Sequence, residues 1–304
     1  MKKRLWLAAV LAILLTGCAN KNEEVLEEKE TIVTECVDEQ DSKVPEDICL
    51  LSFDERKVHI PELASDYEIW YLADSHIIVE NGNEDEQTKA YASERKPVFV
   101  HESGYSSDVV FSQFIDMANA QKPDLVLFGG DIIDFPSEAN VAFLKSELQR
   151  LTVPYIMTYG NHDWTFPWEY MTEEGKAKYR PMLEEVMTDH YAEFTDLTVV
   201  AVDNSSNQVE ADSMESLTNV TENGKPMILL MHVPLSTEEL IAKAKENWAN
   251  PVTLGMQVHG GIAPNEASTE LWNMTHDDES MIKAVLAGHV HFAHEEALSD
   301  ATVE

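Results

Sequence analysis

Six short apolar runs recur along the chain, and five of them end directly on aspartate, asparagine or histidine. The runs have the length of buried strands, and amphipathic stretches separate the first three, which is the alternation of an α/β protein. In an open α/β sheet, sites form where the carboxyl ends of the strands meet. We therefore predict an α/β fold whose polar strand ends converge. The six runs lie at residues 67–73, 124–129, 153–159, 197–203, 226–231 and 282–287.

Two amphipathic stretches between these runs predict helices, with Ser137 as the N-cap of the second. Longer irregular stretches at residues 78–106 and 247–274 interrupt the pattern, and we expect them to cover a site. The residues that share one face of each predicted helix are Phe111, Phe114, Ile115 and Ala118 in the first, and Val141, Leu144, Leu148 and Leu151 in the second.

The side chains that follow the strands are ones that bind divalent transition metals. A lone histidine at a strand end is more often structural, and aspartate or asparagine there usually belongs to a turn. Five such groups in one chain make a coherent donor set of oxygen and nitrogen without thiolate, enough for two ions with one carboxylate to bridge. The residues are Asp74, His76, Asp131, Asp134, Asn161, His162, Asp163, His232, His289 and His291.

The order of these motifs resembles the calcineurin-like metallophosphoesterase superfamily. The matching motifs are D-x-H at 74–76, G-D-x-x-D at 130–134, G-N-H-D at 160–163, His232, and G-H-x-H at 288–291. This resemblance implies a sandwich of two β-sheets flanked by helices, with a dinuclear metal site at the carboxyl ends of the strands. It also implies that the protein hydrolyses phosphoesters.

The resemblance assigns a role to each motif residue. Asp131 would bridge two divalent ions of Mn, Fe or Zn, whose identity the donor set leaves open. A hydroxide that bridges the ions would attack phosphorus, and His162 would protonate the leaving group. Asp134 would orient His162, with a plain turn aspartate as the alternative, and we expect Asp163 to brace its loop. The implied ligands are Asp74, His76 and His291 for the first ion, and Asn161, His232 and His289 for the second.

The substrate implied by the resemblance is a small phosphomonoester or phosphodiester. Phe135, Pro136 and Asp163 depart from the protein serine/threonine phosphatases, and Asp134 stands where purple acid phosphatases have a tyrosine ligand, so the chain is more similar to exported bacterial phosphohydrolases. A non-catalytic metal-binding surface lipoprotein and a nuclease of the same superfamily are the alternatives. The formal net charge of −35 repels polyanions, so we expect no nucleic-acid partner. Nothing in the sequence indicates an oligomeric state.

The amino terminus has the pattern of a secretory signal: Lys2, Lys3 and Arg4, then an apolar stretch, then small residues. Its end, "LTGC", resembles the lipobox of bacterial lipoproteins, and an ordinary signal peptide with a chance cysteine is the alternative. We predict that residues 1–17 are a lipoprotein signal peptide and that lipid attaches to Cys18. The protein would then be extracytoplasmic, with the membrane as a partner through this anchor.

The remaining chain divides into an acidic tether at 18–62 and a metallophosphoesterase domain at 63–304. Outside the cytoplasm, Cys36 and Cys49 are candidates for a disulfide, with two free thiols as the alternative. The chain ends soon after His291, whereas the family usually continues with one or two more strands, so we expect a truncated carboxyl terminus.

Overall fold

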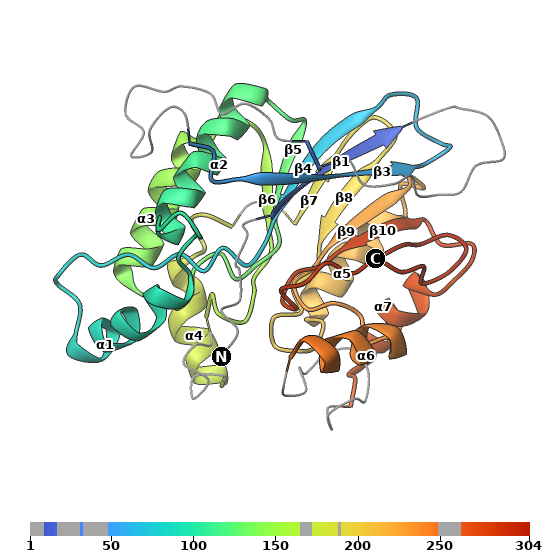
Figure 1. Ribbon diagram of the computed structural model, residues 1–304. Coiled ribbons are helices and arrows are strands. Elements are labelled where there is room, and N and C mark those ends of the chain that lie inside the picture. Colours follow the sequence, from blue (N-terminus) through green and yellow to red (C-terminus); the bar gives the residue numbers. More distant parts are fainter. Residues whose placement is uncertain (1–8, 17–30, 33–47, 165–171, 188–189, 249–262) are drawn as a thin grey trace.

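Two β-sheets pack face to face, and helices lie on the outer side of each sheet (Figure 1). This confirms the predicted two-sheet α/β architecture, and all six apolar runs form strands. The computed structural model describes residues 9–16, 31–32, 48–164, 172–187, 190–248 and 263–304. The six predicted strands are β4 (Tyr67–Leu72), β5 (Leu125–Phe128), β6 (Tyr155–Met157), β8 (Thr198–Ala201), β9 (Met227–Leu230) and β10 (Ile282–Leu286).

The first sheet has six strands in the order β2-β3-β1-β4-β5-β6. Its other members are β1 (Ala9–Thr16), β2 (Thr31–Ile32) and β3 (Ser52–His59). Strand β1 is parallel to β3 and antiparallel to β4, whereas β4, β5 and β6 are mutually parallel. The carboxyl ends of β4, β5 and β6 therefore lie at one edge of the sheet.

The second sheet has the order β10-β9-β8-β7, where β7 is Tyr191–Glu193. Strands β8, β9 and β10 are parallel, and β7 pairs antiparallel with β8. The carboxyl ends of these parallel strands also share an edge, so each sheet delivers its polar strand ends in one place.

Alternation along each strand builds three apolar layers, because successive strand residues point to opposite faces. Ile69 and Leu125 belong to the layer between the sheets, while Trp70 and Val126 face α2 and α3. On the second sheet, residues that alternate with those of the middle layer pack under α5 and α7. The middle layer contains Leu127, Ile156, Val199, Ala201, Ile228, Leu230 and Ala284.

Both predicted helices are present, and they are α2 and α3, which cover the first sheet (Figure 1). The predicted cap of α3 is confirmed, because the Ser137 side chain accepts a hydrogen bond from Asn140 N. The α-helices are α1 (Glu86–Arg95), α2 (Ser107–Gln121), α3 (Glu138–Arg150), α4 (Glu173–Tyr179), α5 (Ala211–Thr221), α6 (Glu238–Asn247) and α7 (Glu266–Thr275), with short 3-10 helices η1 (Lys96–Val98) and η3 (Arg180–Met182).

The stretch at 78–106 is less irregular than its sequence indicates, because it contains α1 and η1. Helix α1 begins at a cap in which the Asp85 carboxylate accepts from Thr88 N, but it buries only Ala92. A helix that is polar nearly all round has no apolar stripe, so periodicity does not detect it. The stretch at 247–274 likewise contains part of α7, and its residues 249–262 lie outside the described part of the chain.

The ordered body begins before residue 63, so the end of the predicted tether belongs to the domain. Leu50, Leu51 and Phe53 are buried in the core beside α2, and the Gln113 side chain bonds Leu50 N and Ile48 O. The charged strand β3 conceals this packing in the sequence, because its outward residues dominate its composition. Residues 18–30 and 33–47 of the tether lie outside the described part.

Strand β1 comprises residues 9–16, which fall within the predicted signal peptide. Cleavage after residue 17 would therefore remove β1 from between β3 and β4, and the signal peptide stays a prediction. Within the described ranges no helix is long and apolar enough to cross a membrane. Cys49 is disulfide-bonded. Its predicted partner Cys36, and the predicted lipidation residue Cys18, lie outside those ranges, so both assignments stay predictions.

The last residues return to the second sheet, where Val303 forms a bridge with Ala284 of β10 and another with Ala297. The amide of Leu235 donates to the Glu304 carboxylate, which ties this end to the loop after β9. The predicted truncation of the carboxyl terminus stays a prediction.

Candidate metal centre

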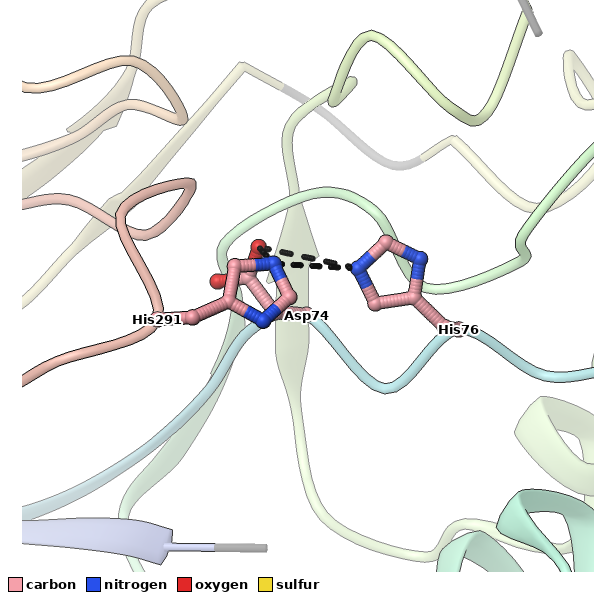
Figure 2. A group of neighbouring side chains, drawn as sticks. All are labelled: Asp74, His76 and His291. Carbon is pink, nitrogen blue, oxygen red and sulfur yellow. Dashed lines mark hydrogen bonds and ion pairs between the residues drawn. The ribbon is translucent and has the colours of Figure 1, made fainter. Parts of the chain in front are cut away.

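The loops that follow β4, β5, β6, β9 and β10 bring the seven predicted metal ligands together with His162 and Asp134. Three groups have ligand atoms within 4.8 Å of one another, and they share members or lie in contact. Figure 2 shows His76 pointing toward Asp74 and His291, which lie near opposite ends of the domain's sequence. The groups are Asp74 with His76 and His291, Asp131 with His232 and His289, and His76 with Asp134 and His162.

Most of these side chains project from a strained backbone. Among the described residues seven non-glycine positions have positive φ, and five of them are predicted metal ligands. Left-handed backbone at such residues costs on the order of 1–3 kcal/mol each and persists only where surrounding structure enforces it. At two of these positions backbone bonds to the loop after β5 enforce it, because Asp74 N donates to Gly130 O and His76 N donates to Asp131 O. The five φ values are 54° at Asp74, 44° at His76, 50° at Asp131, 72° at His289 and 53° at His291.

Two motif glycines allow the loops to approach one another closely. A Cβ at Gly160 would collide with the backbone nitrogen and carboxylate of Asp131. A Cβ at Gly288 would lie 2.5 Å from Asp74 Oδ2. The glycines of the G-N-H-D and G-H-x-H motifs are therefore required by close contact, because any side chain there would push a predicted ligand aside.

In the first ligand group, two of the three distances between ligand atoms match those around a bound metal ion, and the third, from His76 Nε2 to Asp74 Oδ1, is longer at 4.0 Å. His291 Nε2 lies 3.2 Å from Asp74 Oδ1 and 3.2 Å from His76 Nε2. Metal–ligand bonds of about 2.0–2.2 Å place neighbouring ligand atoms roughly 3.0–3.6 Å apart. Burial raises the pKa of Asp74, but the charge and hydrogen bond of His291 outweigh it and lower the pKa to about 2. The group therefore offers an ionised carboxylate and two converging imidazoles to a cation.

The second ligand group is built around His232, which is fully buried. Its Nε2 lies 3.2 Å from Asp131 Oδ2 and 3.2 Å from Asn161 Oδ1. The same Asp131 oxygen lies 3.9 Å from His76 Nε2 of the first group. Since Asp131 Oδ1 accepts from His162 N at 2.7 Å, Oδ2 faces both groups. One carboxylate oxygen is thus shared by the two groups.

Hydrogen bonds on the far ring nitrogens turn the histidines toward the site. His232 Nδ1 lies 2.8 Å from Gly129 O, and His76 Nδ1 lies 2.9 Å from Asp134 Oδ1. In a neutral imidazole, a proton on Nδ1 leaves Nε2 unprotonated, as a metal requires. Burial lowers the pKa of His232, but the charge of Asp131 and their hydrogen bond outweigh burial and raise it to about 9. Burial and the neighbouring His232 lower the pKa of His289 to about 3.

His162 is buried and belongs to neither the first nor the second ligand group, but to the third, with His76 and Asp134. Its Nδ1 lies 2.9 Å from the backbone oxygen of Asp134 and 3.2 Å from the Asp134 carboxylate. Asp134 is fully buried, and although burial raises its pKa, hydrogen bonds from Arg95, His162 and His76 lower the pKa well below its usual value. Asp134 thus contacts His162 as predicted, chiefly through its carbonyl, while its carboxylate is nearer to His76.

Asp163 braces the loops, as we expected. It is fully buried, and its carboxylate accepts hydrogen bonds from the backbone amides of Asp131, Ile133 and Gly160 at 3.0, 3.1 and 2.7 Å. One side chain therefore joins the loop after β5 to the loop after β6.

Two further residues of the site come from the stretch at 78–106 and were not predicted. Arg95 forms an ion pair with Asp134, and Phe99 stacks on the ring of His76. Neither follows a strand or has a fixed spacing to a motif, so the sequence carried no signal for them. Only the packing of α1 and η1 against the site reveals their role.

The family assignment agrees with this geometry. The sequence pattern of the calcineurin-like phosphoesterase family matches residues 67–293, so the chain belongs to that family. It is accordingly a metal-dependent phosphoesterase, a hydrolase. No curated protein matches the chain. Among solved structures, a dimetal phosphatase from Danio rerio is similar, with 12% sequence identity and a TM-score of 0.44 over 77% of this chain and 85% of that chain.

Proposed function

We propose that the protein hydrolyses a small phosphomonoester or phosphodiester at a centre of two divalent transition-metal ions, Mn, Fe or Zn. The observation that carries this proposal is the single Asp131 oxygen that faces two separate ligand groups. A shared carboxylate is what a two-metal site needs, and such sites are suited to displacement at phosphorus.

The residues that would hold the ions are those of the first and second ligand groups, together with Asn161. When bound, the ions would supply a nucleophile from water and neutralise the phosphate oxygens. Imidazole and carboxylate donors suit Mn, Fe and Zn alike, and the lack of thiolate argues against a structural zinc. The first ion would bind Asp74, His76 and His291, the second would bind Asn161, His232 and His289, and Asp131 would bridge them.

His162 is the proposed proton donor to the leaving oxygen. Its Nδ1 faces the backbone carbonyl of Asp134, so only Nε2 remains to give a proton to the substrate. A positioned general acid accelerates such a step by about 10²–10⁴-fold. Asp134 orients the ring through that carbonyl and, more weakly, through its carboxylate.

We also propose that the protein is anchored outside the cytoplasmic membrane by lipid on Cys18. The basic, apolar and small-residue order of residues 1–18 supports this. Metabolic labelling with a radioactive fatty acid should mark the wild-type protein and not Cys18→Ser. Equal labelling of both proteins, or of neither, would contradict the anchor.

Purified protein reconstituted with metal should hydrolyse nitrophenyl phosphate esters. His162→Ala should keep its metal content while the rate falls about 10²–10⁴-fold. Asp74→Asn is the matched variant that should lose metal from the first group. Metal-replete protein that hydrolyses no phosphomonoester, phosphodiester or cyclic nucleotide would refute the proposal and favour a non-catalytic metal-binding protein. Nicking of plasmid DNA would instead identify a nuclease.

A further inference from the structure

Arg95, the last residue of α1, binds Asp134 with a two-pronged contact. Its Nε donates to Asp134 Oδ2 and its Nη2 donates to Asp134 Oδ1, each at 2.8 Å. Asp134 is fully buried, and 23% of the Arg95 side chain is exposed. A planar guanidinium that meets a carboxylate with two parallel bonds fixes the orientation of that carboxylate as well as its charge.

Phe99 links the same segment to a predicted metal ligand. Its ring stacks on His76, with ring centres 4.2 Å apart and an interplanar angle of 11°. The Arg95 guanidinium lies 5.0 Å from the centre of the Phe99 ring. Arg95 and Phe99 therefore contact the two partners of one hydrogen bond, the bond between Asp134 and His76.

The segment that carries both residues is anchored to the domain. Ile78, Ala92 and Phe135 form a small buried cluster, with Tyr91 and Phe99 packed against it. The Asn140 side chain accepts from Val79 N at 2.8 Å, which ties the start of the segment to α3. These contacts hold the end of α1 beside Asp134, so the position of Arg95 is fixed by packing.

The oxygen that Arg95 holds is shared by two histidines. Asp134 Oδ1 lies 2.9 Å from His76 Nδ1 and 3.2 Å from His162 Nδ1. An ion pair that served stability alone would not need its carboxylate to meet both rings. Rotation of the Asp134 carboxylate would disturb the ring that presents Nε2 to a metal and the ring that presents Nε2 to a leaving group.

We propose that Arg95 is a positioning residue, which fixes the Asp134 carboxylate so that His76 and His162 each present Nε2 to the reaction centre. This inference rests on the proposed function for its kinetic consequence, but not for its effect on His76. Partners of this kind typically change metal affinity or activity about 10–100-fold when they are removed.

The test compares Arg95→Ala with Arg150→Ala. Arg150 also pairs with buried or partly buried carboxylates, Glu147 and Asp116, but at the end of α3 away from the site. In metal-free protein, ¹⁵N spectra of the imidazole nitrogens should show the Nδ1-protonated form of His76 in wild type and Arg150→Ala. Arg95→Ala should show a mixture of tautomers, and its zinc affinity should fall about 10–100-fold.

A kinetic measurement separates positioning from general destabilisation. Alkyl phosphates need protonation of the leaving oxygen far more than nitrophenyl phosphate does, so they report on His162. Arg95→Ala should lose about tenfold more kcat on an alkyl phosphate than on nitrophenyl phosphate, whereas Arg150→Ala should keep the wild-type ratio. Arg95→Lys keeps the positive charge but not the two parallel hydrogen bonds of the guanidinium, so it should change the ratio of the two kcat values in the same direction by a smaller factor.

Wild-type His76 spectra and an unchanged leaving-group ratio in Arg95→Ala would overturn the inference. If Arg95→Ala does not fold, the same two measurements on Arg95→Lys decide, with wild-type values as the refuting result. Absence of phosphoesterase activity in the wild-type protein would refute the proposed function. The His76 spectra and the zinc affinity would still decide the role of Arg95.

Discussion

Asp163 offers a direct test of how the site is built. Its carboxylate satisfies three backbone amides, and no other acceptor is bonded to these amides in the described structure. Oδ2 accepts from Asp131 N and Gly160 N, while Oδ1 accepts from Ile133 N. Replacement by alanine leaves all three donors unsatisfied. Replacement by asparagine keeps one acceptor oxygen but places an NH₂ group, which is itself a donor, opposite one backbone N–H.

The expected cost follows from those counts. A buried donor that loses its acceptor costs about 1–3 kcal/mol, so Asp163→Ala should lose roughly 3–9 kcal/mol of unfolding free energy. In Asp163→Asn the amide oxygen can replace Oδ2, which leaves one donor unsatisfied and a loss of roughly 1–3 kcal/mol. A total stability of about 5–15 kcal/mol means that the alanine variant is close to unfolding.

Urea unfolding of metal-free protein measures both losses. Asp124→Asn is the matched control, because Asp124 is exposed and accepts a single backbone bond from Glu68 N, so its loss should stay below about 1 kcal/mol. Metal-replete Asp163→Asn should keep kcat within about tenfold of wild type, since Asp163 supports the loops and does no chemistry. Equal losses in Asp163→Asn and Asp163→Ala would refute the count of donors. A kcat reduced 100-fold or more at full metal content would refute the supporting role.

Three other predictions concern Gly160, His289 and His232. Gly160→Ala should cost about 3 kcal/mol or more in urea unfolding, because its Cβ collides with Asp131, while Gly224→Ala, which meets open space at a φ of 70°, should cost about 1 kcal/mol. His289→Gly should be more stable than His289→Ala by about 1 kcal/mol, since φ is 72° there; equal stability would argue against backbone strain. The His232 pKa of about 9 lies above the ordinary value of 6.5, so in metal-free protein its stabilising contribution is complete below pH 6.5 and is lost as pH rises through 9. Metal can bind only the neutral form of His232, so metal binding should release a proton and metal affinity should rise with pH up to about 9. Calorimetry of metal binding in buffers of different ionisation enthalpy measures both.

The sequence was informative wherever strand ends carry the chemistry. His291 and Asp74 are far apart in the chain and follow strands of different sheets, yet each comes directly after the carboxyl end of a strand, and the order of the motifs was enough to predict that they meet. Arg95 and Asp134 meet for a different reason, because a polar helix packs through Ala92 against Phe135. Such a contact depends on tertiary packing, and no local pattern predicts it.

The sequence also did not show the left-handed backbone at the predicted ligands or how far the domain extends toward the amino terminus. A positive φ at Asp74 or His76 depends on hydrogen bonds to the loop after β5, which the D-x-H motif does not state. Strand β3 carries mostly charged residues, so its alternation was masked by composition, although Phe53 and Val58 are buried. The disulfide of Cys49 was within reach of the sequence, whereas its partner stays a prediction.

The left-handed backbone at five predicted ligands also bears on which residues these positions favour. Glycine at any of these positions would relieve the backbone strain, although at Asp74 and Asp131 it would also remove a carboxylate that accepts a backbone hydrogen bond. This chain has aspartate or histidine at all five. Backbone stability alone would favour glycine at these positions, so the strain accompanies the side chains that the proposed metal centre requires.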